Sequence, residues 1–337
     1  MIYYRPIAMQ DVARPSSALP IAGGWCWFDR VEVLERGRPP VVVPVRDVPE
    51  AALTALCAPR PDFAGLSMAK PRLMGILNVT PDSFSDGGRF LAPEAAVAQG
   101  REMAGAGADI IDIGGESTRP GATEVAVEEE VQRTAPVIAA LRSGGIATRI
   151  SIDTRKAAVA KAALAAGADF VNDVAAFTYD PALIGVVAGA QAPVCLMHAQ
   201  GTPQTMQDEP YYDDVLLDVY DFLAERVAAA EAAGIARSRI MIDPGIGFGK
   251  TLEHNLTLIR GLSLFHGLGC PILLGVSRKK FIGTIGGEVQ ADRRAPGSVA
   301  VALAGVAQGA QVLRVHDVWE TRQAVALWRS VTLGDWA

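Results

Sequence analysis

The chain has 337 residues, of which 50% are hydrophobic, and a formal net charge of −6. This much apolar sequence suffices for one large domain or two ordinary ones, and it excludes a largely disordered protein. Because the net charge is negative, no broad basic surface is available, and we expect neither a nucleic-acid partner nor binding to an anionic membrane.

The cysteines and the N-terminus indicate the compartment. The four cysteines show no C-x-x-C spacing and read as reduced thiols. Residues 1–10 lack the basic flank and apolar segment of a secretory signal, and no apolar stretch reaches the ~18 residues of a membrane span. We therefore expect a cytoplasmic protein.

Residues 1–70 differ in texture from the rest of the chain, with several prolines, an aromatic cluster and no repeated strand–helix rhythm. Their pattern predicts strands at 31–34 and 41–45, a short helix near 49–57 and a linker at 59–69. We predict an appended N-terminal segment of mixed structure, to which the sequence assigns no chemistry.

From residue 71 onward, apolar strand candidates alternate with alanine-rich helical stretches. The eight strand candidates are residues 73–79, 109–114, 149–153, 170–174, 194–198, 240–243, 272–276 and 312–316. Helical periodicity marks 95–106, 128–141, 157–166, 215–233 and 299–308. Eight β–α units predict a (β/α)8 TIM barrel over residues 71–337, with the N-terminal segment packed on it or covering its bottom. A doubly wound sheet is the fallback, but the first β–α turn lacks G-x-G-x-x-G.

Polar side chains follow nearly every predicted strand. Because the βα loops of a barrel meet at one rim, these residues should converge on one site. In strand order they are Asn78, Thr80, Asp82 and Asp86; Glu116, Ser117, Thr118 and Arg119; Asp153, Thr154 and Arg155; Asn172 and Asp173; Met197 and His198; Asp243; Ser277, Arg278 and Lys279; Arg314 and His316.

Each residue also has an ordinary structural interpretation. Asp153 or Asp243 alone could cap a helix, and Lys279 alone could be solvated. His316 could be a structural histidine, and Arg314 could pair with a buried acid. The recurrence of polar residues at the same edge of nearly every strand favours a shared site instead, and Arg314 and His316 share a strand face.

The candidates fall into two chemical groups. The group suited to anionic oxygens consists of Asn78, Arg119, Ser277 and His316, aided by the N–H groups of the helix after Ser277. The group suited to a planar ring rich in donors and acceptors consists of Asp153, Asn172, Asp243 and Lys279. Arg314 could lie flat against such a ring. A heterocycle that bears a diphosphate matches both groups.

Metal and nucleotide motifs are weak. The four histidines have no H-x-x-x-H or H-E-x-x-H spacing, which argues against zinc. We expect instead Mg²⁺ brought by a diphosphate and touched by one or two protein oxygens, with Asn78 as the candidate ligand. The G-K-T at 249–251 is not a phosphate loop, because residue 244 is proline where that motif needs glycine.

At these positions the chain resembles the dihydropteroate synthase family. The matching segments are NVTPDSFSDGG (78–88), DIGGESTRPG (112–121), IDT (152–154), ND (172–173), QGTPQTMQ (200–207), DPGIGFGK (243–250), SRK (277–279) and RVHD (314–317). They come in family order, and residues 1–70 have no counterpart in the core family pattern.

The resemblance implies an enzyme that condenses 6-hydroxymethyl-7,8-dihydropterin diphosphate with 4-aminobenzoate, using Mg²⁺, to give 7,8-dihydropteroate and diphosphate. It also implies a homodimer and a sulfonamide target.

The residues implied for the dihydropterin are Asp153, Asn172, Asp243 and Lys279, with Met197 and Phe248 lining the pocket and Arg314 on the ring face. Those implied for the diphosphate are Asn78, Thr118 and His316. The aminobenzoate carboxylate would bind Ser277 and the following helix N-terminus, under Phe84, Arg119 and Pro120. Asp86 would stabilise the pterin cation, so the implied catalytic residues are Asp86, Asp153, Lys279 and Arg314.

Three alternatives stay open at this point. A pterin-dependent methyltransferase shares the barrel and the pterin-gripping residues, but would not need the two loops at 78–88 and 112–121. A catalytically silent pterin-binding homologue should have lost loop residues. A class I aldolase with Lys279 as its Schiff-base lysine rests on the fold alone.

Overall fold

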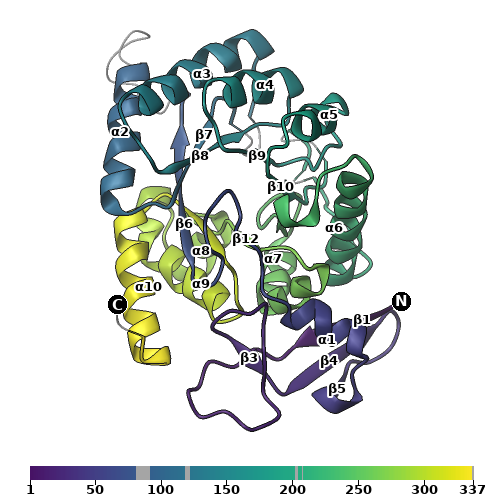
Figure 1. Ribbon diagram of the computed structural model, residues 1–337. Helices are drawn as coiled ribbons and strands as arrows, with labels where there is room; N and C mark the ends of the chain where they lie inside the picture. The colour runs from purple at the N-terminus through teal and green to yellow at the C-terminus, as the bar shows by residue number, and fades with distance from the viewer. Residues whose placement is uncertain (81–91, 118–121, 202–203, 207, 336–337) are drawn as a thin grey trace.

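The computed structural model describes residues 1–80, 92–117, 122–201, 204–206 and 208–335. Eight parallel strands form the central sheet in the order β11-β10-β9-β8-β7-β6-β13-β12 (Figure 1). They are β6 (Arg72–Asn78), β7 (Ile110–Gly114), β8 (Arg149–Asp153), β9 (Phe170–Asp173), β10 (Val194–Met197), β11 (Ile240–Asp243), β12 (Leu273–Leu274) and β13 (Val312–Val315). A parallel bridge between Ile242 and Ile272 joins β11 to the segment before β12 and closes the barrel.

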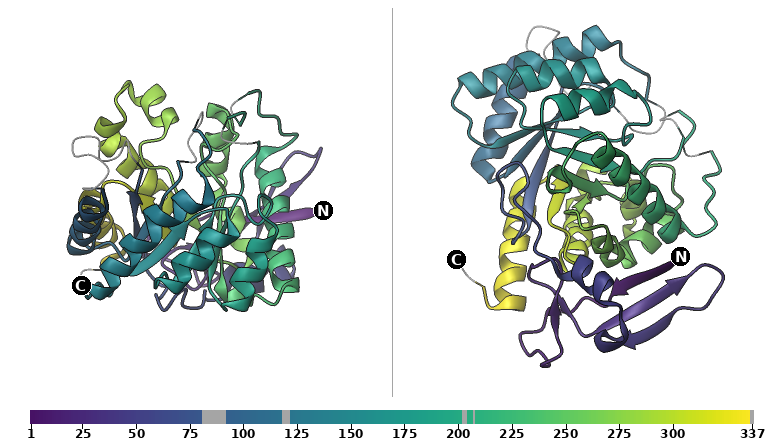
Figure 2. Two further views of the ribbon diagram at one scale, coloured as in Figure 1. Left: turned by 90° about the horizontal axis from the view of Figure 1, so that it is seen from above. Right: turned by 45° about the vertical axis from the view of Figure 1, so that its right-hand side comes forward.

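Helices surround this sheet on the outside (Figures 1 and 2). The barrel helices are α2 (Ala92–Ala106), α3 (Val127–Ser143), α4 (Ala157–Ala165), α5 (Ala182–Gly189), α6 (Val215–Ala232), α7 (Leu252–Arg260), α8 (Lys280–Gly286), α9 (Ala295–Val306) and α10 (Val318–Leu333). Shorter 3₁₀ turns are η3 (Arg237–Arg239), η4 (Leu262–Leu268) and η5 (Ala291–Arg294). The predicted TIM barrel is confirmed, with all eight strands where the sequence places them. Among the described residues, no helix combines the length and apolar character needed to cross a bilayer.

Local sequence explains these elements. The residues of β7 are buried along its whole length, as expected for a strand covered on both faces. The side chain of Asp214 accepts from the backbone of Leu216 and Leu217 and so begins α6, while Thr251 and His254 form a capping box on α7. β12 is shorter than the five residues expected from the sequence, because only Leu273 and Leu274 pair with β13.

The first seventy residues form their own small elements. A three-stranded antiparallel sheet has the order β1-β4-β5, from β1 (Ile2–Pro6), β4 (Arg30–Glu35) and β5 (Val41–Pro44). A two-stranded pair, β2 (Leu19–Pro20) and β3 (Trp27–Phe28), the turn η1 (Val45–Asp47) and the helix α1 (Glu50–Cys57) complete it. β4, β5 and α1 match the predicted elements, whereas β1 was not predicted.

This segment packs against the barrel, on the side opposite α3 and α4 (Figure 1). The Tyr3 hydroxyl donates to Asp221 of α6 at 2.9 Å, and the Trp25 indole N–H donates to the Val306 carbonyl of α9 at 2.7 Å. The Arg60 guanidinium donates to the His266 carbonyl of η4 at 2.7 Å. The N-terminal segment thus contacts three elements of the barrel's outer wall, which are α6, α9 and η4.

The linker closes the bottom of the barrel. Phe63 and Met68 are buried in a cluster with residues from the starts of the strands, which are Met74, Ile110, Phe170, Cys195, Met241, Leu273 and Val312. The rings of Phe63 and Phe170 meet edge to face, with centroids 5.1 Å apart. Since this end of the barrel interior is filled, a ligand can enter only from the carboxyl ends of the strands.

Candidate active site

The predicted site residues that the structure describes lie at those carboxyl ends. Asn78, Asp153, Met197 and Asp243 are the last residues of β6, β8, β10 and β11. The parallel register sets Asp153 beside Asn172 and Met197 beside Asp243. Six other predicted residues lie outside the described part of the chain, namely Asp82, Phe84, Asp86, Thr118, Arg119 and Pro120.

Arg314 lies between two carboxylates. Its Nε donates to Asp112 Oδ2 at 2.6 Å, and its Nη2 donates to Asp153 Oδ2 at 2.7 Å. Burial alone would lower the pKa of Arg314, but Asp112 and Asp153 raise it above its usual value. The guanidinium therefore stays protonated and holds the two strand ends together.

Asp153 has one oxygen without a partner. Its side chain is nearly buried, and Oδ1 has no hydrogen-bond partner among the described residues. Burial raises the pKa of Asp153 well above its usual range. The positive charge of Arg314 lowers this pKa, whereas the nearby negative charges of Asp112, Glu130 and Asp173 raise it further. A buried acceptor of this kind suits a ligand N–H group.

The sequence interpretation missed Asp112. This residue lies inside β7 and is fully buried, and its oxygens accept from Arg314, from Ser151 Oγ at 2.6 Å and from Asn172 Nδ2 at 3.2 Å. The available signal was a carboxylate in the middle of an otherwise apolar strand, where an unpaired charge would be very costly.

Asp243 lies on the opposite wall of the barrel from β7. Its Oδ1 accepts from the Gly245 N–H at 2.7 Å, and burial raises its pKa to about 6. The sequence predicts that the glycines after Asp243 let the backbone pass a flat ligand. The structure shows another reason: a Cβ on Gly245 would lie 1.8 Å from the His198 carbonyl, and one on Gly249 would lie 2.5 Å from the Gln200 carbonyl. The loop after β11 therefore packs directly on the loop after β10.

A buried lysine fastens these two loops. Lys250 Nζ lies 2.9 Å from His198 Nδ1 and donates to the Phe248 carbonyl at 2.9 Å. Burial lowers the pKa of Lys250 to about 7. His198, which the strand-end pattern offered as a site candidate, is thus occupied in holding the loops.

Lys279 and Phe248 form one wall of the site. The ammonium nitrogen lies 4.0 Å from the centre of the Phe248 ring. A Cβ on Gly247 would come within 3.0 Å of Lys279 Cδ, so glycine leaves the passage that Lys279 uses. Both side chains are half-buried and remain within reach of a ligand.

Ser277 and His316 pair at the ends of β12 and β13. The His316 backbone N–H donates to Ser277 Oγ at 3.1 Å, and the His316 ring Nδ1 lies 3.0 Å from the same oxygen. The expected helix after Ser277 begins only at Lys280, so the Ser277 hydroxyl lies beside His316 and not at the first turn of α8. Between them, Arg278 adopts a φ of 58° and pairs with Asp317.

Several strand-end candidates belong to a separate buried network. Glu116 accepts from Lys156 Nζ at 2.6 Å and from Arg155 at 2.9 Å, and Lys156 also binds Glu130 at 2.8 Å. Thr154 Oγ1 donates to Glu130 at 2.7 Å. Glu116 and Arg155 therefore anchor the base of the loop after β7 through ion pairs, and Thr154 joins the network through its hydrogen bond to Glu130.

Asp173 has a structural task as well. Its side chain accepts from the backbone N–H groups of Ala175 at 2.9 Å and Phe177 at 2.6 Å. Burial raises its pKa to about 6 against these hydrogen bonds. The turn after β9 thus uses the carboxylate, whereas the neighbouring Asn172 turns to Asp112.

The described residues contain no group of three or more His, Cys, Asp or Glu arranged to hold a metal ion. Asn78, half-buried at the end of β6, offers one amide oxygen at the rim. This donor set suits a hard cation that arrives with most of its oxygen ligands already supplied by a diphosphate.

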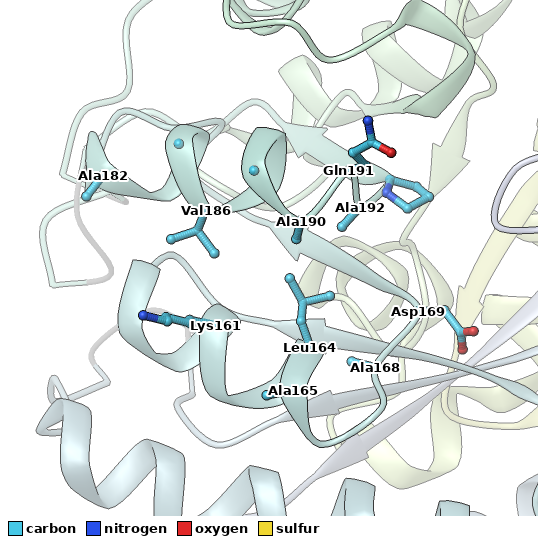
Figure 3. A pocket seen from close by; sticks show the side chains of 13 residues that line it. Lys161, Leu164, Ala165, Ala168, Asp169, Ala182, Val186, Ala190, Gln191 and Ala192 are labelled. Atoms are coloured by element: carbon cyan, nitrogen blue, oxygen red, sulfur yellow. The ribbon is translucent and has the colours of Figure 1, made fainter.

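A groove with a volume of about 800 Å³ lies elsewhere, between α4 and α5 (Figure 3). Its lining includes Lys161, Leu164, Asp169, Val186 and Gln191, near the amino ends of β9 and β10. None of the predicted site residues line it, and it lies toward the opposite end of the strands from Asp153 and Asp243.

Comparisons with known proteins agree with this geometry. The family profile described as pterin binding enzyme matches residues 74–316. The dihydropteroate synthase of Escherichia coli strain K12 is 47% identical over 260 residues, which cover 77% of this chain and 91% of that protein. The dihydropteroate synthase of Neisseria meningitidis serogroup C is 48% identical over 269 residues, covering 79% and 94%.

A solved structure of Xanthomonas albilineans dihydropteroate synthase with 4-aminobenzoic acid superposes with a TM-score of 0.76 at 50% identity, covering 81% of this chain and 98% of that one. The same enzyme with 7,8-dihydropteroate superposes with a TM-score of 0.74 at 46% identity, with the same coverage of both chains. The chain belongs to the dihydropteroate synthase family of pterin-binding enzymes.

Proposed function

We propose that this protein condenses 6-hydroxymethyl-7,8-dihydropterin diphosphate with 4-aminobenzoate, giving 7,8-dihydropteroate and diphosphate. The observation that supports this most is Asp153, which lies in the mouth of a barrel whose bottom is closed. Arg314 holds its Oδ2, while its Oδ1 has no hydrogen-bond partner in the described part of the chain. The family's named activity and the ligands of its solved members fit a ring bound at that acceptor.

The dihydropterin would bind between the walls of the mouth. Asp153 and Asp243 would accept ring N–H groups, and Lys279 would donate to the ring carbonyl. Further contacts would come from Asn172 beside Asp153, from Met197 and Phe248 along the pocket, and from Arg314, whose planar guanidinium can lie on the ring face.

The diphosphate would lie toward Asn78 and His316. Mg²⁺, held there by the Asn78 oxygen and the diphosphate itself, would neutralise charge on the leaving group. Thr118, from the loop after β7, would complete this part of the site by analogy with the family. His316 is fixed for the task through its two contacts with Ser277.

The reaction then needs charge stabilisation more than a strong base. The bond between the pterin methylene and the diphosphate breaks, and its electron pair leaves with the diphosphate, while the ring spreads the positive charge. The neutral aryl amine forms the new C–N bond and releases a proton. It requires positioning and exclusion of water, for which we propose Ser277 at the carboxylate and Phe84, Arg119 and Pro120 closing over the ring. Asp86 would stabilise the cation.

We further propose a cytoplasmic homodimer in which residues 1–70 serve as a structural extension and residues 71–337 form the catalytic barrel. The exposed apolar side chains of α10, Trp319, Leu327 and Val331, are spaced to share one helix face and offer a surface for the second copy.

The test is an assay of the purified protein with dihydropterin diphosphate and Mg²⁺, with and without 4-aminobenzoate, scoring dihydropteroate by mass. Formation of product only with 4-aminobenzoate is the expected result. Tight pterin binding without product would favour a methyltransferase or a silent homologue, and both substrates recovered unchanged with no binding would refute the proposal.

A further inference from the structure

The Asp112 carboxylate joins four strands of the barrel. It lies on β7 and accepts from Ser151 of β8, Asn172 of β9 and Arg314 of β13, with its two oxygens shared among these donors. Its side chain is fully buried, with an exposed fraction of 0%. A carboxylate at such depth is tolerated only where several donors satisfy it, and here three side chains do so.

Two of these donors belong to the proposed pterin site. Arg314 would lie on the ring, and Asn172 would contact its edge, yet each turns a donor group toward Asp112. The side chains of Asn172 and Arg314 rotate about several single bonds, and their hydrogen bonds to Asp112 restrict these rotations.

We propose that Asp112 is a positioning residue, which orients Arg314 and Asn172 for the dihydropterin ring. Because it also pairs with Arg314, it weakens the electrostatic stabilisation that Arg314 gives to the Asp153 carboxylate. This inference rests on the proposed function, because it assigns Asp112 a task at the same pocket. Asp112 does not touch the substrate in this scheme; it acts through its two partners.

The effect of Asp112 on Asp153 follows from the charged groups that surround the Asp153 carboxylate. Arg314 is the one cation paired with both carboxylates in the described structure, while Asp112, Glu130 of α3 and Asp173 of β9 face Asp153 as negative groups. Removing the charge of Asp112 leaves Arg314 to Asp153 alone and removes a like charge from its surroundings. Both changes lower the pKa of Asp153.

The experiment compares Asp112→Asn with wild type and with Asp109→Asn, a matched control. Asp109 precedes the same strand at its other end and pairs with Arg72 at 2.9 Å, away from the mouth of the barrel. Steady-state kinetics with dihydropterin diphosphate, Mg²⁺ and 4-aminobenzoate are measured from pH 5 to 9, together with thermal unfolding and calorimetric binding of the pterin diphosphate alone.

For Asp112→Asn we expect kcat/KM for the pterin substrate to fall on the order of 100-fold, because misplaced binding groups cost about this much. We also expect the acid limb of the pH profile to move to lower pH, a change that a merely structural role would not produce. Asp109→Asn should keep the wild-type kinetics and profile.

Wild-type kinetics and an unmoved acid limb in Asp112→Asn would overturn the proposal, as would equal losses in both variants. If Asp112→Asn does not fold, Ser151→Ala takes its place, because it removes one donor to Asp112 without touching Arg314. It should lower kcat/KM by less than about 100-fold, and wild-type kcat/KM in this variant would overturn the proposal. The wild type is measured first: absence of dihydropteroate there would refute the proposed function, whereas an active wild type with an unaffected Asp112→Asn refutes only this role.

Discussion

The ammonium nitrogen of Lys279 lies 4.0 Å from the centre of the Phe248 ring, which joins the loop after β11 to the loop after β12. A cation over an aromatic face gains about 0.5–2 kcal/mol, depending on how far it is desolvated. Because both side chains are half-buried, the ring restricts the lysine to the pocket without hiding it.

We therefore predict that Phe248→Leu, which keeps an apolar side chain but removes the aromatic face, raises KM for the pterin substrate by roughly 2- to 30-fold, the equivalent of the cation–π energy. Lys279→Met should lose far more, since it removes the donor itself. Phe265→Leu is the control, because that ring lies in η4, ahead of β12 at the amino ends of the strands, and neighbours Tyr220. Equal KM values for Phe248→Leu and the control would contradict the assignment.

The Ser277 and His316 contacts predict strong coupling between the two residues. Ser277 Oγ meets both the backbone and the ring of His316, so Ser277→Ala should release the ring as well as remove the hydroxyl. In a double-mutant cycle with His316→Ala, measured as kcat/KM, we expect an interaction energy of about 0.5–3 kcal/mol, the range for residues in contact. A cycle of His316→Ala with Ser143→Ala, on the exposed end of α3, should be additive. Additivity in both cycles would show that Ser277 and His316 act separately.

The burial of Asp243 predicts that its ionised carboxylate lowers the stability of the fold, although the proposed activity requires it. Burial raises its pKa to about 6 in the folded chain from an ordinary value of 3.8, so the folded state binds the proton more tightly than the unfolded state. Above about pH 6 the ionised carboxylate destabilises the fold by about 3 kcal/mol, and below about pH 4 this penalty is absent.

Asp243→Asn should therefore raise the free energy of unfolding at pH 8 by up to about 3 kcal/mol and give little gain at pH 4, while abolishing most activity. Urea unfolding at both pH values measures this. Asp109→Asn, which removes the negative charge paired with Arg72, should show no such pH-dependent gain. A variant less stable than wild type at pH 8 would contradict this reading of the site.

The sequence predicted the barrel and its rim well, because both depend on local pattern. Apolar runs located all eight strands, and the polar residues at or near the end of each run located Asp153, Asn172, Asp243 and Arg314 at one edge. β1 escaped prediction because it is short, half polar and ends at Pro6, so it lacks a clear alternation.

Pairings between distant residues could not be predicted in this way. A strand-end position tells which rim a side chain occupies, but not which neighbour it turns to. Glu116 turns to Arg155 and Lys156, and His198 turns to Lys250, so these candidates stabilise loops. Asp112 shows the converse, since a residue inside a strand proves to contact two site residues.

The closed bottom of the barrel predicts a mutation that affects stability alone. Phe63 is fully buried against Phe170 and the first residues of several strands, at the end of the barrel opposite Asp153 and Asp243. Phe63→Ala should lower the free energy of unfolding by about 3–5 kcal/mol, the usual cost of removing a buried phenylalanine ring. KM for both substrates should stay unchanged, because the linker does not reach the mouth.

Urea unfolding and steady-state kinetics test the two parts together, with Val42→Ala on the exposed face of β5 as a neutral control. An altered KM in Phe63→Ala, at temperatures where the variant is fully folded, would mean that the linker also shapes the site, because a packing defect confined to the bottom cannot change substrate affinity.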